Sequence, residues 1–303
     1  MARQANDVPK SRKFEEDLAP LLAGAGEQPP SEVFGGVSDE FWLWINTEGY
    51  RRSAASRAFL PGLPQEDVQR RFTNKSNDDA LVEAFEIYRL VRDLFERHVG
   101  ALAEAEGVLD FGCGWGRVIR FFLKDLEHDR LTGAEYDGEL VDFCKASNPW
   151  CTFIHSEAEP PLPFGDAQFS CIYAYSVFSH FSESMHLAWL RELKRVLRPG
   201  GALMLSIRPR SFIEYLGMIR AQEQEVEFPV LLGMFPETEE ELARYDAGEY
   251  CYTPYDPSRP DAWWGEACIP PAYIEREWGR FFEVEEIVEA SEQIKQHVVM
   301  LRA

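Results

Sequence analysis

The chain of 303 residues is long enough to bury a sizeable core and to form one large domain or two small ones. Its composition, 45% hydrophobic and 27% charged, is that of an ordinary globular protein, and no segment has the apolar length of a membrane span. A net charge of −21 predicts a surface that repels nucleic-acid phosphates and anionic lipids, so we expect neither a nucleic-acid nor a membrane partner. A small basic patch could still form at Arg208 and Arg210.

The six cysteines include no Cys-x-x-Cys pair and lie mostly within apolar runs. This pattern favours buried, reduced thiols in a cytoplasmic protein over a disulfide framework or a zinc site. The first residues lack the apolar core of a signal peptide, which agrees with a cytoplasmic location. No histidine pair has metal-ligand spacing, so we expect no metal.

The amino-terminal third is predicted to be helical behind a polar leader. Residues 1–30 are rich in Pro, Gly and Ala, and we expect a mobile arm there. Residues 31–106 are expected to form a helical cap, with a long helix starting near Asn77. An aromatic stripe precedes it, and we expect this stripe to pack against the main sheet rather than to bind a ligand; it comprises Phe41, Trp42, Trp44 and Tyr50.

A glycine-rich turn follows the first predicted strand. The apolar strand at 107–111 contains Asp110 and leads into three alternating glycines, Gly112, Gly114 and Gly116. Glycines let the backbone turn sharply and keep side chains out of a ligand's path, and we expect a helix from Arg117 behind them. At the carboxyl end of a parallel strand, such a turn is where ligands bind.

From residue 107 the pattern alternates between strand and helix, which predicts an α/β, doubly wound, mostly parallel sheet. Predicted strands lie at 107–111, 130–135, 152–155, 169–175 and 201–207, and predicted helices at 117–125, 138–147 and 183–197. A helix at 212–224 and a loop-rich insert follow, and two strands at 281–288 and 296–301 end the chain.

Five ordered segments resemble the class I S-adenosylmethionine-dependent methyltransferases, of the Rossmann-like, small-molecule type. They are the glycine turn after an acidic residue, the stretch Leu131 to Asp137, the stretch Ser156 to Phe164, the stretch Phe169 to Phe181, and Leu193 to Gly201. The resemblance implies a seven-stranded sheet with an antiparallel last strand and S-adenosylmethionine as the cofactor. It implies that residues 107–303 form the methyltransferase domain, with an insert at 208–280. A nicotinamide oxidoreductase is disfavoured, because Arg117 stands where a dinucleotide fold needs glycine or alanine.

The resemblance also implies roles for single residues around the cofactor. Asp110 and the three glycines would line the cofactor, and Glu135 would accept both ribose hydroxyls, with Asp137 the cap of the next helix. The carboxylate of Glu157 and the N–H of Ala158 would read the adenine, although Glu159 is an alternative to Glu157. An aromatic face such as that of Tyr175 could stabilise the cationic sulfonium.

His180 is the candidate general base, at the carboxyl side of the fourth strand and four residues after Ser176. A purely structural role is an equal alternative. Eight aromatic residues of the insert could form a lid over the acceptor, or else an extra packed subdomain or a dimer surface; they are Tyr245, Tyr250, Tyr252, Tyr255, Trp263, Trp264, Tyr273 and Trp278.

The sequence therefore predicts methyl transfer to an oxygen, or less readily a nitrogen, of a small molecule such as a sugar or secondary metabolite. The alternative is a non-catalytic protein that binds the cofactor through the same fold and acts in assembly or sensing. The pattern leaves the oligomeric state and the identity of the acceptor open.

Overall fold

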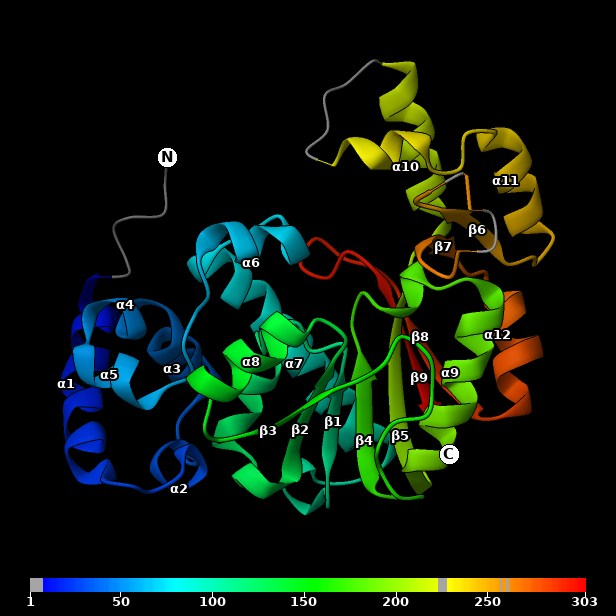
Figure 1. The fold of residues 1–303 in the computed structure, drawn as a ribbon. Helices are drawn as coiled ribbons and strands as arrows, with labels where there is room; N and C mark the ends of the chain where they lie inside the picture. Colours follow the sequence, from blue (N-terminus) through cyan, green and yellow to red (C-terminus); the bar gives the residue numbers. More distant parts are fainter. Residues whose placement is uncertain (1–7, 223–227, 257, 260–261) are drawn as a thin grey trace. The chain divides into compact units, whose positions relative to one another are not determined.

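The computed structural model describes residues 8–222, 228–256, 258–259 and 262–303 (Figure 1). The chain divides into two compact units. The first comprises Met1–Arg92, Leu102–Glu104 and Cys113–His155, and the second comprises Asp93–Ala101, Ala105–Gly112 and Ser156–Ala303. No helix within the described ranges is long and apolar enough to cross a membrane.

Seven strands form one sheet in the order β3-β2-β1-β4-β5-β9-β8. The strands are β1 (Val108–Phe111), β2 (Leu131–Glu135), β3 (Thr152–His155), β4 (Phe169–Ala174), β5 (Leu197–Ile207), β8 (Glu283–Val288) and β9 (His297–Arg302). Strand β9 runs antiparallel to both β5 and β8, whereas β1, β4 and β5 are parallel to one another and β2 is parallel to β3. The predicted doubly wound, mostly parallel sheet with an antiparallel last strand is confirmed.

The first unit is mostly helical. Its helices are α1 (Val8–Ala25), α2 (Pro30–Phe34), α3 (Asp39–Trp44), the π-helix η1 (Ile45–Gly49), α4 (Tyr50–Arg52), α5 (Ala54–Phe59), α6 (Glu66–Thr73), the greater part of α7 (Asn77–His98), and α8 (Gly138–Ser147). Short 3-10 helices lie at Leu102–Glu104, Ile119–Lys124 and His128–Arg130. The predicted starts of α7 and α8 are confirmed.

Helix α1 corrects the prediction of an arm over residues 1–30, of which residues 1–7 lie outside the described range. The reason is an apolar stripe that the overall composition of the segment conceals. Phe14 stacks on Phe41 with ring centres 4.8 Å apart, and Leu18, one turn later, is buried. Apolar residues at helical spacing thus outweigh the Pro, Gly and Ala content of this segment.

The helix predicted at 117–125 is instead a 3-10 helix, η3 (Ile119–Lys124). All six of its residues are buried, including Arg120 and Lys124. An α-helix at the edge of a domain keeps one face in solvent, and this segment has no such face.

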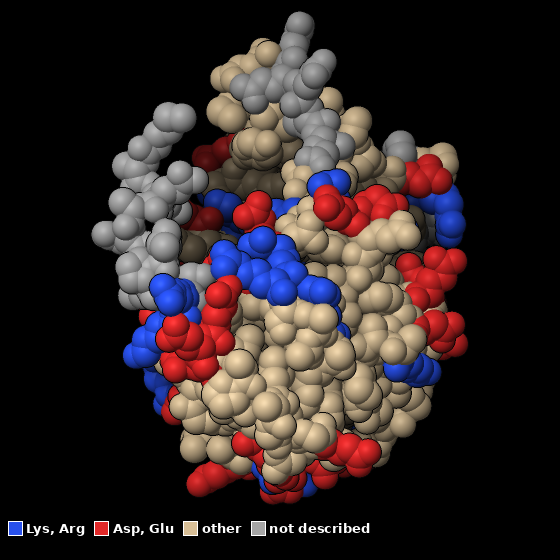
Figure 2. Space-filling model, turned by 90° about the vertical axis from the view of Figure 1, so that its left-hand side faces the viewer, with Lys and Arg blue, Asp and Glu red and all other residues tan. Residues whose placement is uncertain are grey.

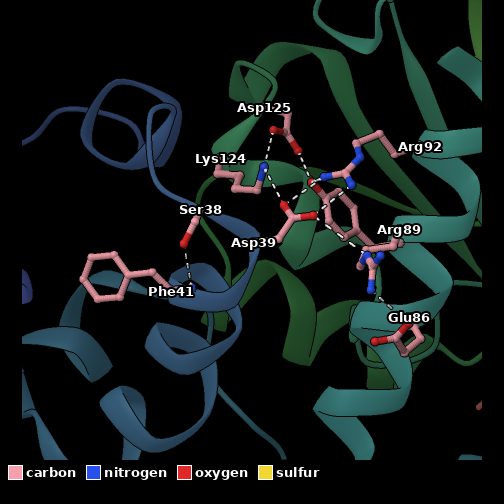
Figure 3. A network of polar contacts seen from close by, with 9 residues as sticks. Ser38, Asp39, Phe41, Glu86, Arg89, Arg92, Lys124 and Asp125 are labelled. Atoms are coloured by element: carbon pink, nitrogen blue, oxygen red, sulfur yellow. Dashed lines mark hydrogen bonds and ion pairs between the residues drawn. The ribbon is translucent and has the colours of Figure 1, made fainter. Parts of the chain in front are cut away.

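A partly buried charge network joins α3, α7 and η3 within the first unit (Figure 3). The carboxylate of Asp39 accepts two hydrogen bonds from Arg92, at 2.9 and 2.8 Å, and lies 3.4 Å from Lys124 Nζ. Lys124 also donates to Asp125 at 2.6 Å. The hydrogen bond from Arg92 is the main reason that the pKa of Asp39 is lowered. Because a buried charge without a partner is costly, this network fixes how the three elements pack.

The second unit contains α9 (Glu183–Val196) and an insert between β5 and β8. The insert comprises α10 (Arg210–Ala221), α11 (Thr238–Asp246), β6 (Cys251–Pro254), β7 (Gly265–Cys268) and α12 (Pro271–Glu277). It also contains short 3-10 helices at Pro229–Gly233 and Trp278–Arg280, and a further one lies before α9, at Phe178–His180. Figure 1 shows α10, α11 and the hairpin β6–β7 gathered in one group. Helix α10 agrees with the helix predicted at 212–224, and the insert after it also contains the pair β6–β7, with which α10 packs around a small core. This core includes Ile213, Leu216, Phe235, Tyr245 and Cys251.

Candidate functional site

The glycine turn begins with a position that only glycine can fill. Gly112 directly follows β1 and has a φ of 75°. A Cβ atom at this position would lie 2.4 Å from Cγ2 of Val177, in the loop after β4. The turn after β1 is therefore in close contact with the segment that carries His180, three residues beyond Val177. Any side chain at residue 112 would push the turn after β1 away from the loop that contains Val177.

Gly114 and Glu135 come together in the first unit. The Gly114 N–H donates to Oε2 of Glu135 at 2.8 Å, and the Asp137 N–H donates to Oε1 at 3.0 Å. Each carboxylate oxygen thus holds one backbone donor and keeps a further accepting position. Gly114 has a φ of 55°, and a Cβ there would meet no atom within 4 Å. The Glu135 carboxylate is therefore fixed in orientation, and it lies beside the Gly114 backbone, where a ligand has room to approach.

These residues fit the adenosyl cofactor that the sequence predicts. Two vicinal hydroxyls need an acceptor with spare lone pairs, which the oriented Glu135 carboxylate provides. Asp137, two residues after Glu135, is the cap that the sequence predicts. Its side chain caps α8 by accepting from the N–H groups of Glu139 at 2.9 Å and Leu140 at 3.4 Å.

The predicted adenine segment follows β3 in the chain. Glu157 is exposed, as is its alternative Glu159, and Ala158 is half-buried. The Ala158 carbonyl accepts a hydrogen bond from the indole of Trp189 at 3.1 Å, which fixes the orientation of this peptide group. The adenine-reading roles of Glu157 and Ala158 stay predictions.

Asp110 and Tyr175 lie on neighbouring strands of the second unit. Asp110 is buried within β1, and Tyr175 stands one residue beyond the end of β4, half-buried. Strands β1 and β4 are parallel, so both residues lie toward the same carboxyl edge. Their cofactor contacts stay predictions.

His180 lies in a polar cluster of the second unit whose other members come from the insert. Its Nδ1 lies 2.9 Å from the Gly265 carbonyl oxygen and 3.0 Å from the hydroxyl of Tyr255. A carbonyl oxygen can only accept, so Nδ1 carries the proton and Nε2 is the basic nitrogen of the neutral ring. Burial lowers the pKa of His180, which keeps the ring neutral near pH 7.

The Nε2 side of His180 faces Ser176, whose Oγ lies 3.5 Å away. Ser176 is held in place by its neighbours. Its N–H donates to Ser206 Oγ at 2.6 Å, and its own Oγ accepts from the amide of Gln296 at 3.0 Å. Ser206 in turn donates to Gln296 Oε1 at 2.8 Å. The basic nitrogen therefore lies beside an ordered hydroxyl at the carboxyl side of β4.

A buried carboxylate anchors the other side of the cluster. The Tyr255 hydroxyl donates to Glu266 Oε1 at 2.6 Å, and Oε2 of Glu266 pairs with Nε of Arg208 at 3.1 Å. Glu266 is only 1% exposed, so this pairing neutralises a charge that is out of solvent. The expected basic patch is thereby corrected, because Arg208 pairs with Glu266 and Arg210 pairs with Asp246 at 2.7 Å.

Trp264 lies against the ring of His180, with ring centres 4.8 Å apart, and is 40% exposed. Of the aromatic residues singled out in the insert, Trp264 and Tyr255 thus reach His180. Tyr252 instead donates to the Ala262 carbonyl at 2.7 Å. The insert consequently packs its own core and also supplies side chains to the His180 cluster.

Sequence reasoning missed the polar residues that surround His180 and hold its neighbours Ser176 and Tyr255 in place. Ser206 lies in β5 and Arg208 directly follows that strand. Glu266 lies in β7, and Gln296 directly precedes β9. No local motif marks any of them. The one available signal was a carboxylate between aromatic and small residues at 263–268, a position that predicts burial with a partner.

Comparisons with known proteins agree with this geometry. Residues 108–201 match the family model described as a methyltransferase domain. A mouse protein named probable tRNA methyltransferase 9B is 35% identical over 101 residues, which are 33% of this chain and 21% of that protein. Phthiotriol/phenolphthiotriol dimycocerosates methyltransferase 1 of Mycobacterium ulcerans is 27% identical over 179 residues, or 57% of this chain and 61% of the relative.

The chain therefore spans less than two thirds of the length of these curated relatives. The crystal structure of magnesium protoporphyrin IX methyltransferase from Synechocystis, solved with bound SAH, covers 86% of this chain and 96% of its own at a TM-score of 0.51. At 14% identity this similarity shows a shared fold. Residues 108–201 are therefore similar to a methyltransferase domain, and the chain shares the α/β fold of a solved methyltransferase.

Proposed function

We propose that the chain transfers a methyl group from S-adenosylmethionine to an oxygen of a small molecule, such as a sugar or a secondary metabolite. The observation that carries this proposal is the neutral ring of His180, whose Nδ1 donates to the Gly265 carbonyl so that Nε2 is left as a proton acceptor. A hydroxyl is a weak nucleophile until a base removes its proton, whereas a neutral amine needs no such help to attack. A buried basic histidine therefore favours an oxygen acceptor over a nitrogen acceptor.

In this mechanism, bound S-adenosylmethionine supplies a methyl group activated by its sulfonium. Glu135 would hold the ribose, and the backbone at Gly114 would lie against the ligand. His180 Nε2 would accept the proton of the acceptor hydroxyl, and the cofactor would supply the methyl group to the acceptor oxygen. The cluster of Tyr255, Glu266 and Arg208 keeps the other ring nitrogen protonated and the ring in place.

The same proposal gives the insert a role as a lid on the acceptor side. Trp264 is supplied by the insert, contacts the His180 ring and keeps 40% of its surface exposed, which suits a wall for a flat acceptor. The buried cysteines support a cytoplasmic location for the enzyme, among them Cys113, Cys144, Cys171 and Cys268.

The named relatives act on different acceptors, so the acceptor class must be tested. One relative is named for tRNA, one for a mycobacterial lipid and one for a porphyrin. A net charge of −21 disfavours RNA, because phosphate contacts supply most of the affinity in RNA binding. A small neutral or cationic acceptor has no such penalty.

The test is transfer of labelled methyl from S-adenosylmethionine to three acceptor pools: a metabolite extract, total tRNA and buffer alone. We expect label in small molecules of the extract, strongly reduced in the variant His180→Ala. Label in the tRNA pool would overturn the small-molecule acceptor. Tight cofactor binding without any turnover would favour the non-catalytic alternative.

A further inference from the structure

A cavity of about 500 Å³ lies among the N-terminal helices of the first unit. Asn46 of the π-helix η1, Tyr50 of α4 and Arg57 of α5 contribute polar groups to its wall. Leu63 and Pro64 contribute apolar surface to the same wall. The volume is that of a small-molecule pocket, and its lining combines apolar surface with a few polar groups.

The charges at the rim leave one arginine without an acidic partner. Arg51 and Asp78 form three hydrogen bonds, at 3.1, 3.0 and 2.7 Å, so their charges largely cancel. Arg57 instead donates to two backbone carbonyls, Tyr50 O at 3.0 Å and Arg51 O at 2.6 Å. In the described part of the chain, no Asp or Glu lies within ion-pair distance of Arg57.

A second cation lies behind the cavity wall. Arg120 is only 1% exposed, and its Nε donates to Oδ1 of Asn46 at 3.1 Å. One terminal nitrogen donates to the Pro61 carbonyl at 3.0 Å, and the guanidinium carbon lies 5.6 Å from the centre of the Tyr50 ring. Burial lowers the pKa of Arg120 to about 10.

Over the described residues, Arg120 has neutral partners and no carboxylate in ion-pair range. A buried cation that lacks a counter-ion costs stability, and an anion placed near it offsets that cost. Both Asn46 and Tyr50 separate Arg120 from the cavity, so the field of its charge acts on whatever fills the cavity. The π-helix that places Asn46 there is a rare form, often found at functional sites.

The surface of the N-terminal helices agrees with a preference for anions. Figure 2 shows a group of Lys and Arg side chains on this side of the molecule, with Asp and Glu side chains around it. In a chain whose net charge is −21, such a local grouping is the place where an anion meets least repulsion.

We propose that this cavity binds a small organic acid, with its carboxylate at Arg57, in the field of the buried Arg120, and its apolar body against Leu63, Pro64 and Leu81. The inference does not depend on methyl transfer, because none of these residues belongs to the glycine turn or to the His180 cluster.

The test is calorimetric titration of the full chain with hexanoate, and with hexylamine as the probe of opposite charge. We expect hexanoate to bind and hexylamine not to bind. Arg57→Gln removes an exposed guanidinium, and we expect it to weaken hexanoate binding roughly tenfold, from the loss of a hydrogen bond to a charged group. Arg52→Gln is the matched control, because Arg52 pairs with Glu15 and Glu48 and does not line the cavity.

Arg120→Met adds an independent arm. We expect this variant to lose hexanoate binding while its thermal midpoint stays equal to or above that of the wild type, since it removes a buried charge without a counter-ion. If Arg120→Met does not fold, Arg57→Gln decides the question. No heat of binding with millimolar hexanoate would overturn the proposal, and so would equal binding of hexylamine or unchanged affinity in Arg57→Gln.

Discussion

The glycine turn and the His180 cluster are built in opposite ways. Gly114, Glu135 and Asp137 lie within 23 residues of one another, and the contacts that orient the carboxylate come from backbone N–H groups. The His180 cluster is built from side chains, and its members are as far apart as Ser176 and Gln296, 120 residues along the chain. The turn is thus a local product of the backbone, whereas the cluster exists only if the insert and the last strands fold around it.

We therefore expect cofactor binding to depend on the glycine turn with Glu135, and methyl transfer to depend on the His180 cluster. Changes at Glu135 should reduce cofactor affinity and leave the fold intact, because the two backbone N–H groups that it binds belong to the half-buried residues Gly114 and Asp137, where water can replace the carboxylate. Changes in the His180 cluster should reduce turnover and leave cofactor affinity intact. The following predictions test that separation, from the largest expected effect to the smallest.

We predict that His180→Ala lowers kcat roughly 10²- to 10⁴-fold, the usual contribution of a general base. The dissociation constant for S-adenosylhomocysteine should stay unchanged. Single-turnover kinetics and calorimetry measure the two quantities, and His128→Ala, which removes an exposed histidine, is the control. A loss smaller than tenfold would make His180 a structural residue.

Glu135→Ala should weaken S-adenosylhomocysteine binding on the order of 30- to 150-fold, since about 2–3 kcal/mol of charge-assisted hydrogen bonding is lost. Glu135→Gln should fall between the wild type and Glu135→Ala, because the amide keeps one accepting oxygen. Circular dichroism checks that both variants fold. Unchanged affinity in Glu135→Ala would show that the ribose is bound elsewhere.

Tyr255→Phe sharpens the comparison within the His180 cluster. Without the hydroxyl, Glu266 loses a hydrogen-bond donor, and its charge, 3.5 Å from Nδ1, acts directly on the ring. Turnover in the wild type should fall only below pH 6.5, because burial lowers the pKa of His180. In Tyr255→Phe we expect this acidic limb to move to higher pH and kcat at neutral pH to fall roughly two- to tenfold. An unmoved limb would contradict the positioning role of Tyr255.

His186 provides the smallest effect and a contrast with His180 in the same unit. It is fully buried among Phe178, Tyr250 and Trp278, and burial lowers its pKa to about 3. The folded state therefore keeps His186 neutral, while the unfolded chain takes up a proton below pH 6.5. Its contribution to stability is complete above pH 6.5 and is lost as the pH falls toward 3.

We expect His186→Phe to flatten the decline in unfolding free energy between pH 6.5 and 5 by up to about 1.4 kcal/mol per pH unit. Tyr250 keeps a partner in this variant, because its hydroxyl also donates to the Phe181 carbonyl at 2.9 Å. Urea titrations at several pH values give the slope. Equal slopes in the two proteins would mean that His186 is protonated in the folded state.

The features that could be predicted from the sequence are those that depend on residues close together in the chain. Strands β1 to β4, helix α8 with its Asp137 cap, and the antiparallel end of the sheet follow from local periodicity, turns and the family pattern. Helix α1 was missed because Pro20 and neighbouring small residues conceal the apolar stripe of the half-buried Phe14 and the buried Leu18. Segment η3 was assigned the wrong type because periodicity cannot distinguish helix types when every side chain is buried.

In the candidate site, too, residues could be placed from the sequence only where their positions depend on local structure. Glu135 could be placed because one helix and one strand connect it to Gly112. Glu266 and Gln296 could not be placed, because their positions depend on pairings such as Tyr252 with Ala267 and Ile207 with His297, which no local signal encodes.

The central claim, that the glycine turn and Glu135 hold an adenosyl cofactor, is tested most directly by one calorimetric experiment on the wild-type chain. S-adenosylhomocysteine and NAD are titrated in parallel into the same preparation. We predict saturable, one-site binding of S-adenosylhomocysteine and no comparable heat with NAD, because Arg117 stands where a dinucleotide fold needs a small residue. Binding of NAD without binding of S-adenosylhomocysteine would contradict the account.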